Sequence, residues 1–393
     1  MTTRSARPGT RARLTSLTGV RFFAAFAVFL FHIAIGRPFA DQPVSDGVFT
    51  VFSKAGWIGV SFFFVLSGFI LTWSARPQDS TTAFWRRRLV KVFPNHLVTY
   101  TATMALYAGA AVAGATAVLN LLLLQPWMPV VDVYFSVDNP SWSLGCELFF
   151  YLLFPLLHRG IVRIRAHRLW WWAVSLMGAV IVLPAVVSAV VPAEPSMLAP
   201  DKPVPALAFW LVYIFPVSRV LDFVLGIVMA RIVLEGRWTG VRPLPSAVLF
   251  AVCYAGSLYL PAVYALNAAT IVPVALLIPA VAHLDIAGRR TWLRGRSLQW
   301  LGEVSFAFYL VHWPVLVYGR RLLGEQRKYS WPVGVVLIAT CATLSLLIAG
   351  LLYTGVERPA MRRWASSRRR PRPVAAVPAD ELSAPPTAAD PTH

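Results

Sequence analysis

The chain is poor in charged residues and in cysteine, although it is 393 residues long. Only 13% of its residues are Asp, Glu, Lys or Arg, whereas 57% are hydrophobic. This balance excludes an ordinary soluble domain and is typical of a protein with many membrane helices. The three cysteines lie in apolar segments, without the spacing of a zinc site or a disulfide framework. A fold held together by disulfides or a metal is therefore not expected.

Acidic residues are scarcer than basic ones, 17 against 36, which gives a formal net charge of +19. Such a surplus can bind nucleic acid when it gathers on a soluble domain. In this chain the basic residues form short groups between apolar segments. No nucleic-acid partner is expected, because groups of this kind mark the cytoplasmic side of membrane proteins.

Ten apolar segments are candidate membrane spans. Basic groups precede the first segment and follow the second, fourth, eighth and tenth, which predicts that both termini are cytoplasmic. The basic connection after the ninth segment breaks this alternation. The sequence thus predicts an all-α, polytopic membrane protein with spans near residues 17–36, 57–75, 96–117, 141–157, 169–192, 206–234 (broken at Pro216), 244–261, 267–284, 303–319 and 332–354.

Three regions are predicted along the chain. Residues 1–13 form a basic cytoplasmic N-terminus, and residues 14–360 form the membrane domain. Residues 361–393 are rich in Arg, Pro and Ala and are expected to be a disordered cytoplasmic tail. No small-residue cleavage site follows the first apolar segment, so it is predicted to be a retained helix and not a signal peptide.

The first span, TGVRFFAAFAVFLFHIAIG, contains one arginine and one histidine. On an α-helix the eleven residues from Arg21 to His32 make three turns plus about 20° and rise about 16 Å. The two side chains therefore share one face. Since polar groups are costly in lipid, this face is expected to line a wet or protein-lined interior. Alternatively, Arg21 reaches the headgroups and His32 only bonds a neighbouring helix.

Two other ionisable residues are predicted at nearly the same depth as His32. His32 lies about 6 Å, Glu147 about 9 Å and His312 about 10 Å from the outer ends of their spans. A carboxylate beside an imidazole can orient a general base, which makes His32 and Glu147 the candidate catalytic pair. Trp142 and His312 are the candidate substrate-binding residues. The alternative is a structural Glu–His pair that joins two helices.

The segment FWRRRLVKVFP, residues 84–94, places Arg86, Arg87 and Arg88 at the cytoplasmic mouth of the third span. Guanidinium groups bind phosphates through paired hydrogen bonds. These three arginines and Arg21 are therefore candidate ligands of a phosphate-bearing cofactor, although topology alone also explains such a cluster. Pro94 is expected to end the local helix or to start the next one.

Six segments together resemble the acyltransferase 3 family of integral-membrane O-acyltransferases, over residues 14–360. In order, they are LTSLTGVRFFAAFAVFLFH, GVSFFFVLSGFIL, FWRRRLVKVFP, SWSLGCELFFYLLFP, LGEVSFAFYLVHWP and VERP. The resemblance implies an essential histidine at His32. It also implies supporting roles for Arg21, for Glu147 and for the arginines at 86–88.

The same resemblance implies transfer of an acyl group, most simply acetyl, from acyl-CoA to a hydroxyl without a metal. The expected acceptor is a sugar or macrolide-type small molecule of antibiotic biosynthesis, or a cell-surface glycan, at the plasma membrane. Some relatives carry a soluble esterase-like domain after the membrane part, which is not expected in this chain. The residues alone leave a second class open, a transporter or flippase for a glycan or antibiotic.

Overall fold

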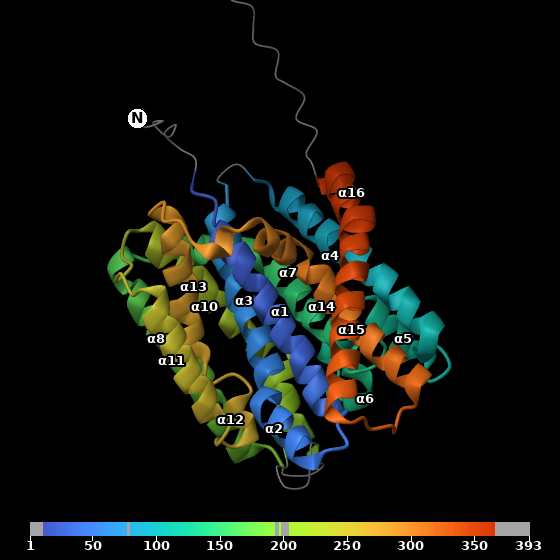
Figure 1. The fold of residues 1–393 in the computed structure, drawn as a ribbon. Helices are drawn as coiled ribbons and strands as arrows, with labels where there is room; N and C mark the ends of the chain where they lie inside the picture. The colour runs from blue at the N-terminus through green and yellow to red at the C-terminus, as the bar shows by residue number, and fades with distance from the viewer. Residues whose placement is uncertain (1–10, 77–78, 193–195, 198–203, 366–393) are drawn as a thin grey trace, which may run out of the picture.

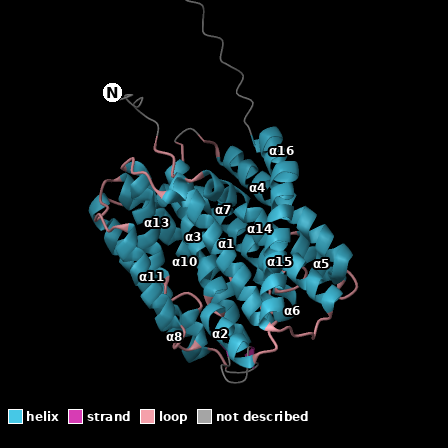
Figure 2. Cartoon of the chain, viewed as in Figure 1, coloured by secondary structure: helices cyan, strands magenta, loops and turns pink. Residues whose placement is uncertain are grey.

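The structure is a computed structural model, and it describes residues 11–76, 79–192, 196–197 and 204–365. Most of this described chain is helical, as Figure 2 shows, and the all-α prediction is confirmed. The tail predicted for residues 361–393 lies outside the described residues from position 366 onward. The same holds for residues 1–10 of the predicted basic N-terminus.

The helices and strands of the described residues follow one another in this order, with 3-10 and π turns written η. They are α1 (Thr15–Gly36), α2 (Gln42–Phe52), α3 (Ala55–Ser74), α4 (Thr81–Thr103), η1 (Met104–Ala108), α5 (Gly114–Leu121), η2 (Gln125–Trp127), α6 (Val131–Tyr134), η3 (Asn139–Ser141), α7 (Trp142–Val162), η4 (Ala166–Arg168), α8 (Leu169–Val190), β1 (Ser196–Met197), β2 (Val204–Pro205), α9 (Ala206–Phe209), η5 (Trp210–Ile214), α10 (Pro216–Leu234), α11 (Pro243–Ser257), α12 (Ala262–Ala265), α13 (Ile271–Ile286), η6 (Trp292–Arg294), α14 (Arg296–Leu323), α15 (Trp331–Leu352), η7 (Tyr353–Glu357), α16 (Arg358–Ala360) and η8 (Met361–Ala365).

Seven helical segments of the described chain are long and apolar enough to cross a membrane. They contain α1, α3, α7, α8, α10, α14 and α15. The other three predicted spans correspond to α11 and α13, which are shorter apolar helices, and to the more polar α4. The count of ten spans therefore stays a prediction.

The outer surfaces of several helices are apolar. Large side chains such as Trp171 and Val182 on α8, Val252 on α11 and Leu347 on α15 are exposed. An apolar surface of this extent is unfavourable in water, but it matches the hydrocarbon of a bilayer. Together with the seven apolar helices, it makes the chain a multi-pass membrane protein.

Helix α1 runs through the middle of the bundle between α3 and α14, as Figure 1 shows. Two glycines allow this close packing. A Cβ at Gly302 of α14 would lie 1.9 Å from the Thr18 carbonyl oxygen, and one at Gly59 of α3 would lie 2.9 Å from that of Ala24. Any larger side chain at Gly302 would push α14 away from α1.

Two groups of helices flank this centre. Helices α8, α10, α11 and α13 pack together on one side, and α4, α14 and α15 pack on the other. The first turn of α1 and the short α16 lie at the same end of the bundle (Figure 1). Ends that lie on the same side of a membrane imply an even number of crossings, as the ten predicted spans would give. The cytoplasmic location of this end remains a prediction.

The structure differs from the sequence prediction around Pro94, which neither ends nor starts a helix. It lies inside α4, which begins at Thr81 with the Ser80 side chain accepting a hydrogen bond from the Ala83 N–H. The loss of the one backbone N–H donor that proline lacks is tolerated at this point. The α-helical hydrogen-bond pattern changes only at the π turn η1. The predicted break at Pro216 is present, since extended Phe215 separates η5 from α10.

Candidate active site

Two cavities lie along α1, one at each end of the helix. The basic cavity, of about 370 Å³, is lined by Arg13, Leu14, Thr15, Thr18, Arg21, Lys91, Gln299, Glu303, Tyr353, Glu357, Arg358 and Met361. The aromatic cavity, of about 240 Å³, is lined by Val28, Phe31, His32, Ile35, Gly56, Trp57, Val60, Phe135, Asn139, Pro140, Trp142, Met197, Phe209, Tyr213, Tyr309 and Trp313.

Arg21 and His32, which the sequence predicted to share one face of the first span, line two different cavities. Arg21 lines the basic cavity, and His32 lines the aromatic cavity. The first residue of α1 at the aromatic cavity is Val28, seven residues beyond Arg21, or about 10 Å along the helix axis. About two turns of α1 therefore separate the two cavities.

A chain of hydrogen bonds fixes the tautomer of His32. His312 Nδ1 lies 3.3 Å from the carbonyl oxygen of Phe308, which can only accept, so this nitrogen carries the hydrogen. In neutral His312 the other nitrogen, Nε2, is then an acceptor, and it lies 2.9 Å from His32 Nδ1. His32 Nδ1 must donate, which places the lone pair of the His32 ring on Nε2.

His312 therefore lies behind His32 and does not line the aromatic cavity. This position differs from the sequence prediction, which treated His312 as substrate-binding. Aromatic contacts hold the pair in place. The His32 ring centroid lies 4.8 Å from that of Trp313 and 5.0 Å from that of Phe31. Trp142, the other predicted substrate-binding residue, does line the cavity and lies 5.0 Å from the Tyr213 ring.

Glu147 is half-buried and does not occupy the place beside His32 that the sequence predicted. Its side-chain partner is Tyr151, one turn further along α7, whose ring lies 5.9 Å from the guanidinium carbon of Arg88. Glu147 follows Trp142 by five residues, or about 7.5 Å along the axis. It therefore lies at a depth between the two cavities.

The three predicted arginines of α4 do not line the basic cavity. Arg86 is exposed, Arg87 forms an ion pair of 2.8 Å with Asp79, and Arg88 lies against aromatic rings. The residue of this segment that reaches the cavity is Lys91. Because α4 already begins at Thr81, the basic residues 86–91 lie inside this helix. Of these, only Lys91, the last one, lies far enough along α4 to line the basic cavity.

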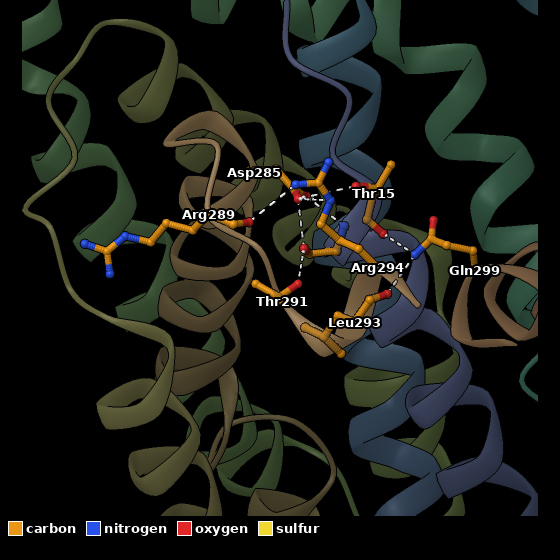
Figure 3. A network of polar contacts seen from close by, with 8 residues as sticks. Thr15, Asp285, Arg289, Thr291, Leu293, Arg294 and Gln299 are labelled. Carbon is orange, nitrogen blue, oxygen red and sulfur yellow. Dashed lines mark hydrogen bonds and ion pairs between the residues drawn. The ribbon is translucent and has the colours of Figure 1, made fainter. Parts of the chain in front are cut away.

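A polar network holds the start of α1 against α13 and α14 (Figure 3). Asp285 of α13 accepts hydrogen bonds from the backbone N–H of Ser16 at 2.7 Å and from its hydroxyl at 2.8 Å. A carboxylate from another helix thus caps the N-terminus of α1. Gln299 donates to the Thr15 carbonyl oxygen at 2.8 Å. Arg21 lies about one and a half turns further along α1 and lines the basic cavity.

Sequence reasoning missed a buried ion pair on α10. Arg219 Nη2 lies 2.6 Å from Asp222 Oδ2 and 2.8 Å from the Ser61 hydroxyl of α3. Asn267 donates to the other Asp222 oxygen at 2.9 Å, and the Arg219 guanidinium lies 5.1 Å from the Tyr213 ring. The network supports one wall of the aromatic cavity. The spacing of Arg and Asp three residues apart in an apolar segment was the available signal.

Among the described residues, no group of three or more His, Cys, Asp or Glu side chains is arranged to hold a metal ion. The Nε2 lone pair of His32 can act as a base or as a nucleophile. Positive charge gathers at the opposite end of α1. Fold and site together define a multi-pass membrane protein with a histidine at the wall of an aromatic cavity and a basic cavity at the other end of the same helix.

The chain belongs to a family described as an acyltransferase domain, which it matches over residues 14–354. It is 44% identical to the acyltransferase MdmB of Streptomyces mycarofaciens over 383 residues, which cover 94% of this chain and 96% of that relative. The protein is therefore an acyltransferase, and the resemblance inferred from the six segments is confirmed. No solved structure matches the chain.

More distant relatives match the chain over about half of their own length. YrhL of Bacillus subtilis is 25% identical, with 88% of this chain and 54% of the relative covered. The peptidoglycan O-acetyltransferase OatA of Listeria monocytogenes is 21% identical, with 89% and 56% covered. With MdmB, these relatives favour an enzyme over the transporter or flippase that the sequence had left open.

Proposed function

We propose that the protein transfers an acyl group, most simply acetyl, from acyl-CoA to a hydroxyl of a sugar or macrolide-type small molecule at the plasma membrane. The observation that carries this proposal is the Nε2 lone pair of His32 at the wall of the aromatic cavity, held by His312. A cell-surface glycan is the alternative acceptor, because OatA is named for peptidoglycan.

The basic cavity suits the phosphate end of acyl-CoA. Arg13, Arg21, Lys91 and Arg358 line it, against the two carboxylates of Glu303 and Glu357. Arginine and lysine side chains are the usual ligands of phosphates in proteins. The pantetheine arm then extends past the depth of Glu147 and brings the thioester to His32.

The aromatic cavity suits the acceptor. None of its sixteen lining residues is charged, and eight of them are Phe, Trp or Tyr. Aromatic faces pack well against the C–H groups of a sugar ring or a macrolide. Ile35, Asn139 and Met197 lie in or beside connections at the end of the bundle away from the basic cavity, so the acceptor enters from that side.

His32 then acts as the general base. Its Nε2 takes the proton of the acceptor hydroxyl, and the oxygen attacks the thioester carbonyl. The C–S bond breaks, an ester forms, and the CoA sulfur leaves as a thiolate that takes the proton back from His32. In the variant route, Nε2 attacks the carbonyl first and an acyl-histidine then passes the group to the hydroxyl.

The test is a reconstitution with purified protein in lipid nanodiscs, acetyl-CoA and a panel of glycoside and macrolide acceptors. Release of free CoA thiol that depends on one acceptor, with the acetylated product seen by mass spectrometry, supports the proposal. Release of CoA that does not depend on any acceptor contradicts the proposal. The absence of CoA release with every acyl-CoA tested also contradicts it.

A further inference from the structure

Glu357 has no part in the proposed transfer steps, although it lines the basic cavity. It belongs to the VERP segment near the end of the membrane domain. Its side chain is only 2% exposed, whereas the other charged residues of the cavity are half-buried or exposed. A carboxylate buried at a membrane boundary is costly unless other groups satisfy it.

Both oxygens of Glu357 are satisfied by α4. Oε1 pairs with Lys91 Nζ, and Oε2 accepts a hydrogen bond of 2.6 Å from the amide of Asn95. Lys91 and Asn95 are four residues apart and lie on the same face of α4. The carboxylate is thus held at a fixed point between α4 and η7.

The two partners of the ion pair differ in their access to the cavity. The Lys91 side chain is 27% exposed, against 2% for Glu357. A ligand in the basic cavity can therefore reach more of Lys91 than of Glu357. An ammonium group has three N–H donors, so the bond to Glu357 leaves two for a ligand.

The charges around Lys91 explain why a carboxylate is needed there. Burial and, to a smaller degree, Arg21 and Arg88 lower the pKa of Lys91, whereas the Glu357 carboxylate raises it. The π turn η7 ends at Glu357, and Arg358, the next residue, also lines the cavity. Turns of this type often occur at functional sites because they shift side chains relative to a regular helix.

We propose that Glu357 is a positioning residue of the donor site, which holds the Lys91 ammonium group aimed at a phosphate of the acyl donor. This inference rests on the proposed function, because it assumes that the basic cavity takes a phosphate-bearing thioester. Asn95 fixes the second oxygen of Glu357, so that the carboxylate cannot turn away from Lys91.

The first test is Glu357→Gln, which keeps the shape of the side chain and removes its charge. We expect the KM for acetyl-CoA to rise about tenfold, the effect of one charge-assisted hydrogen bond, with kcat changed less than about twofold. The matched control is Glu235→Gln, which breaks the Arg231–Glu235 ion pair of α10 and should leave both constants unchanged. An unchanged KM in Glu357→Gln overturns the proposal.

The second test is a double-mutant cycle with Lys91→Met. If Glu357 acts through Lys91, adding Glu357→Gln to Lys91→Met raises the KM no further. A purely structural carboxylate would instead give additive effects on KM and a loss of thermal stability in both backgrounds, and this result contradicts the proposal. If Glu357→Gln does not fold, Asn95→Ala must raise the KM with kcat preserved, and an unchanged KM overturns the proposal.

Binding of unacylated CoA to wild-type protein separates this inference from the proposed function. We expect CoA to raise the melting temperature of the wild type more than that of Glu357→Gln. If CoA neither binds to the wild type nor is released from acetyl-CoA, the proposed function fails. If CoA stabilises both proteins equally while turnover proceeds, only the role of Glu357 fails.

Discussion

The two cavities differ in chemistry although the same helix lines both. The basic cavity contains four cationic and two anionic side chains, whereas the aromatic cavity contains no charged side chain. Phosphates are bound by cationic side chains, which the basic cavity contains. A reacting thioester and hydroxyl benefit from a site that excludes water, such as the aromatic cavity. The difference indicates that binding of the donor and chemistry on its acyl group are separated along α1.

This separation makes the effects of mutations predictable. Changes at the aromatic end should lower kcat or weaken acceptor binding, and changes at the basic end should raise the KM for acyl-CoA. Variants at four positions, three at the aromatic end and one at the basic end, can sharpen or break this division.

His32→Ala should have the largest effect. Without Nε2, no described group at the cavity wall takes the hydroxyl proton, so kcat should fall about 10³-fold or more. Thiol release with acetyl-CoA and acceptor measures this loss, and CoA binding by thermal shift should remain as in the wild type. Substantial turnover by this variant would remove His32 from the chemistry.

His312→Leu should have the next largest effect. With no acceptor at Nδ1, His32 can adopt the tautomer with its hydrogen on Nε2, and we expect kcat to fall about 10²-fold. His312→Gln supplies a side-chain oxygen in the same region and should recover part of the rate. Equal losses in the two variants would show that packing matters at this position and not the hydrogen bond.

Arg21→Gln should raise the KM for acetyl-CoA about tenfold with a smaller change in kcat, because it removes one phosphate ligand from the basic cavity. The matched control is Arg86→Gln, since Arg86 is exposed and outside that cavity. A donor titration checks both variants. If Arg86→Gln has the larger effect, the phosphates bind elsewhere on α4.

Trp142→Phe should have the smallest effect, a rise of about threefold in the KM for the acceptor, because it reduces one aromatic contact and fills most of the same space. The KM for acetyl-CoA should not change. Acceptor titration at saturating donor measures the first quantity. An effect confined to the donor would place the acceptor outside the aromatic cavity.

Helix periodicity predicted that Arg21 and His32 share one face of the first span. The eleven-residue spacing put Arg21 and His32 on one face of α1, and the structure places them in two cavities along that helix. Most helices also lie where the apolar segments predicted, because a span of lipid requires a minimum apolar length. The limits of α4 were wrong, since its polar first turns carry no apolar signal.

The partners of the site residues could not be predicted in the same way. His312, not Glu147, bonds His32, although both residues were assigned to nearly the same depth. Depth follows from the distance along a span, but the rotation of one helix against another depends on packing between distant segments, such as Gly302 against Thr18. A single sequence contains no direct signal for such contacts.

The central claim is that acyl-CoA binds with its phosphates at the basic end of α1 and that its acyl group is transferred to the acceptor at the aromatic end. Proteoliposomes with uniformly oriented protein test it most directly, with acetyl-CoA supplied on one side only and acceptor present on both. We predict release of free CoA only when acetyl-CoA is on the side of the α1 N-terminus. Equal release from the opposite side would contradict the account.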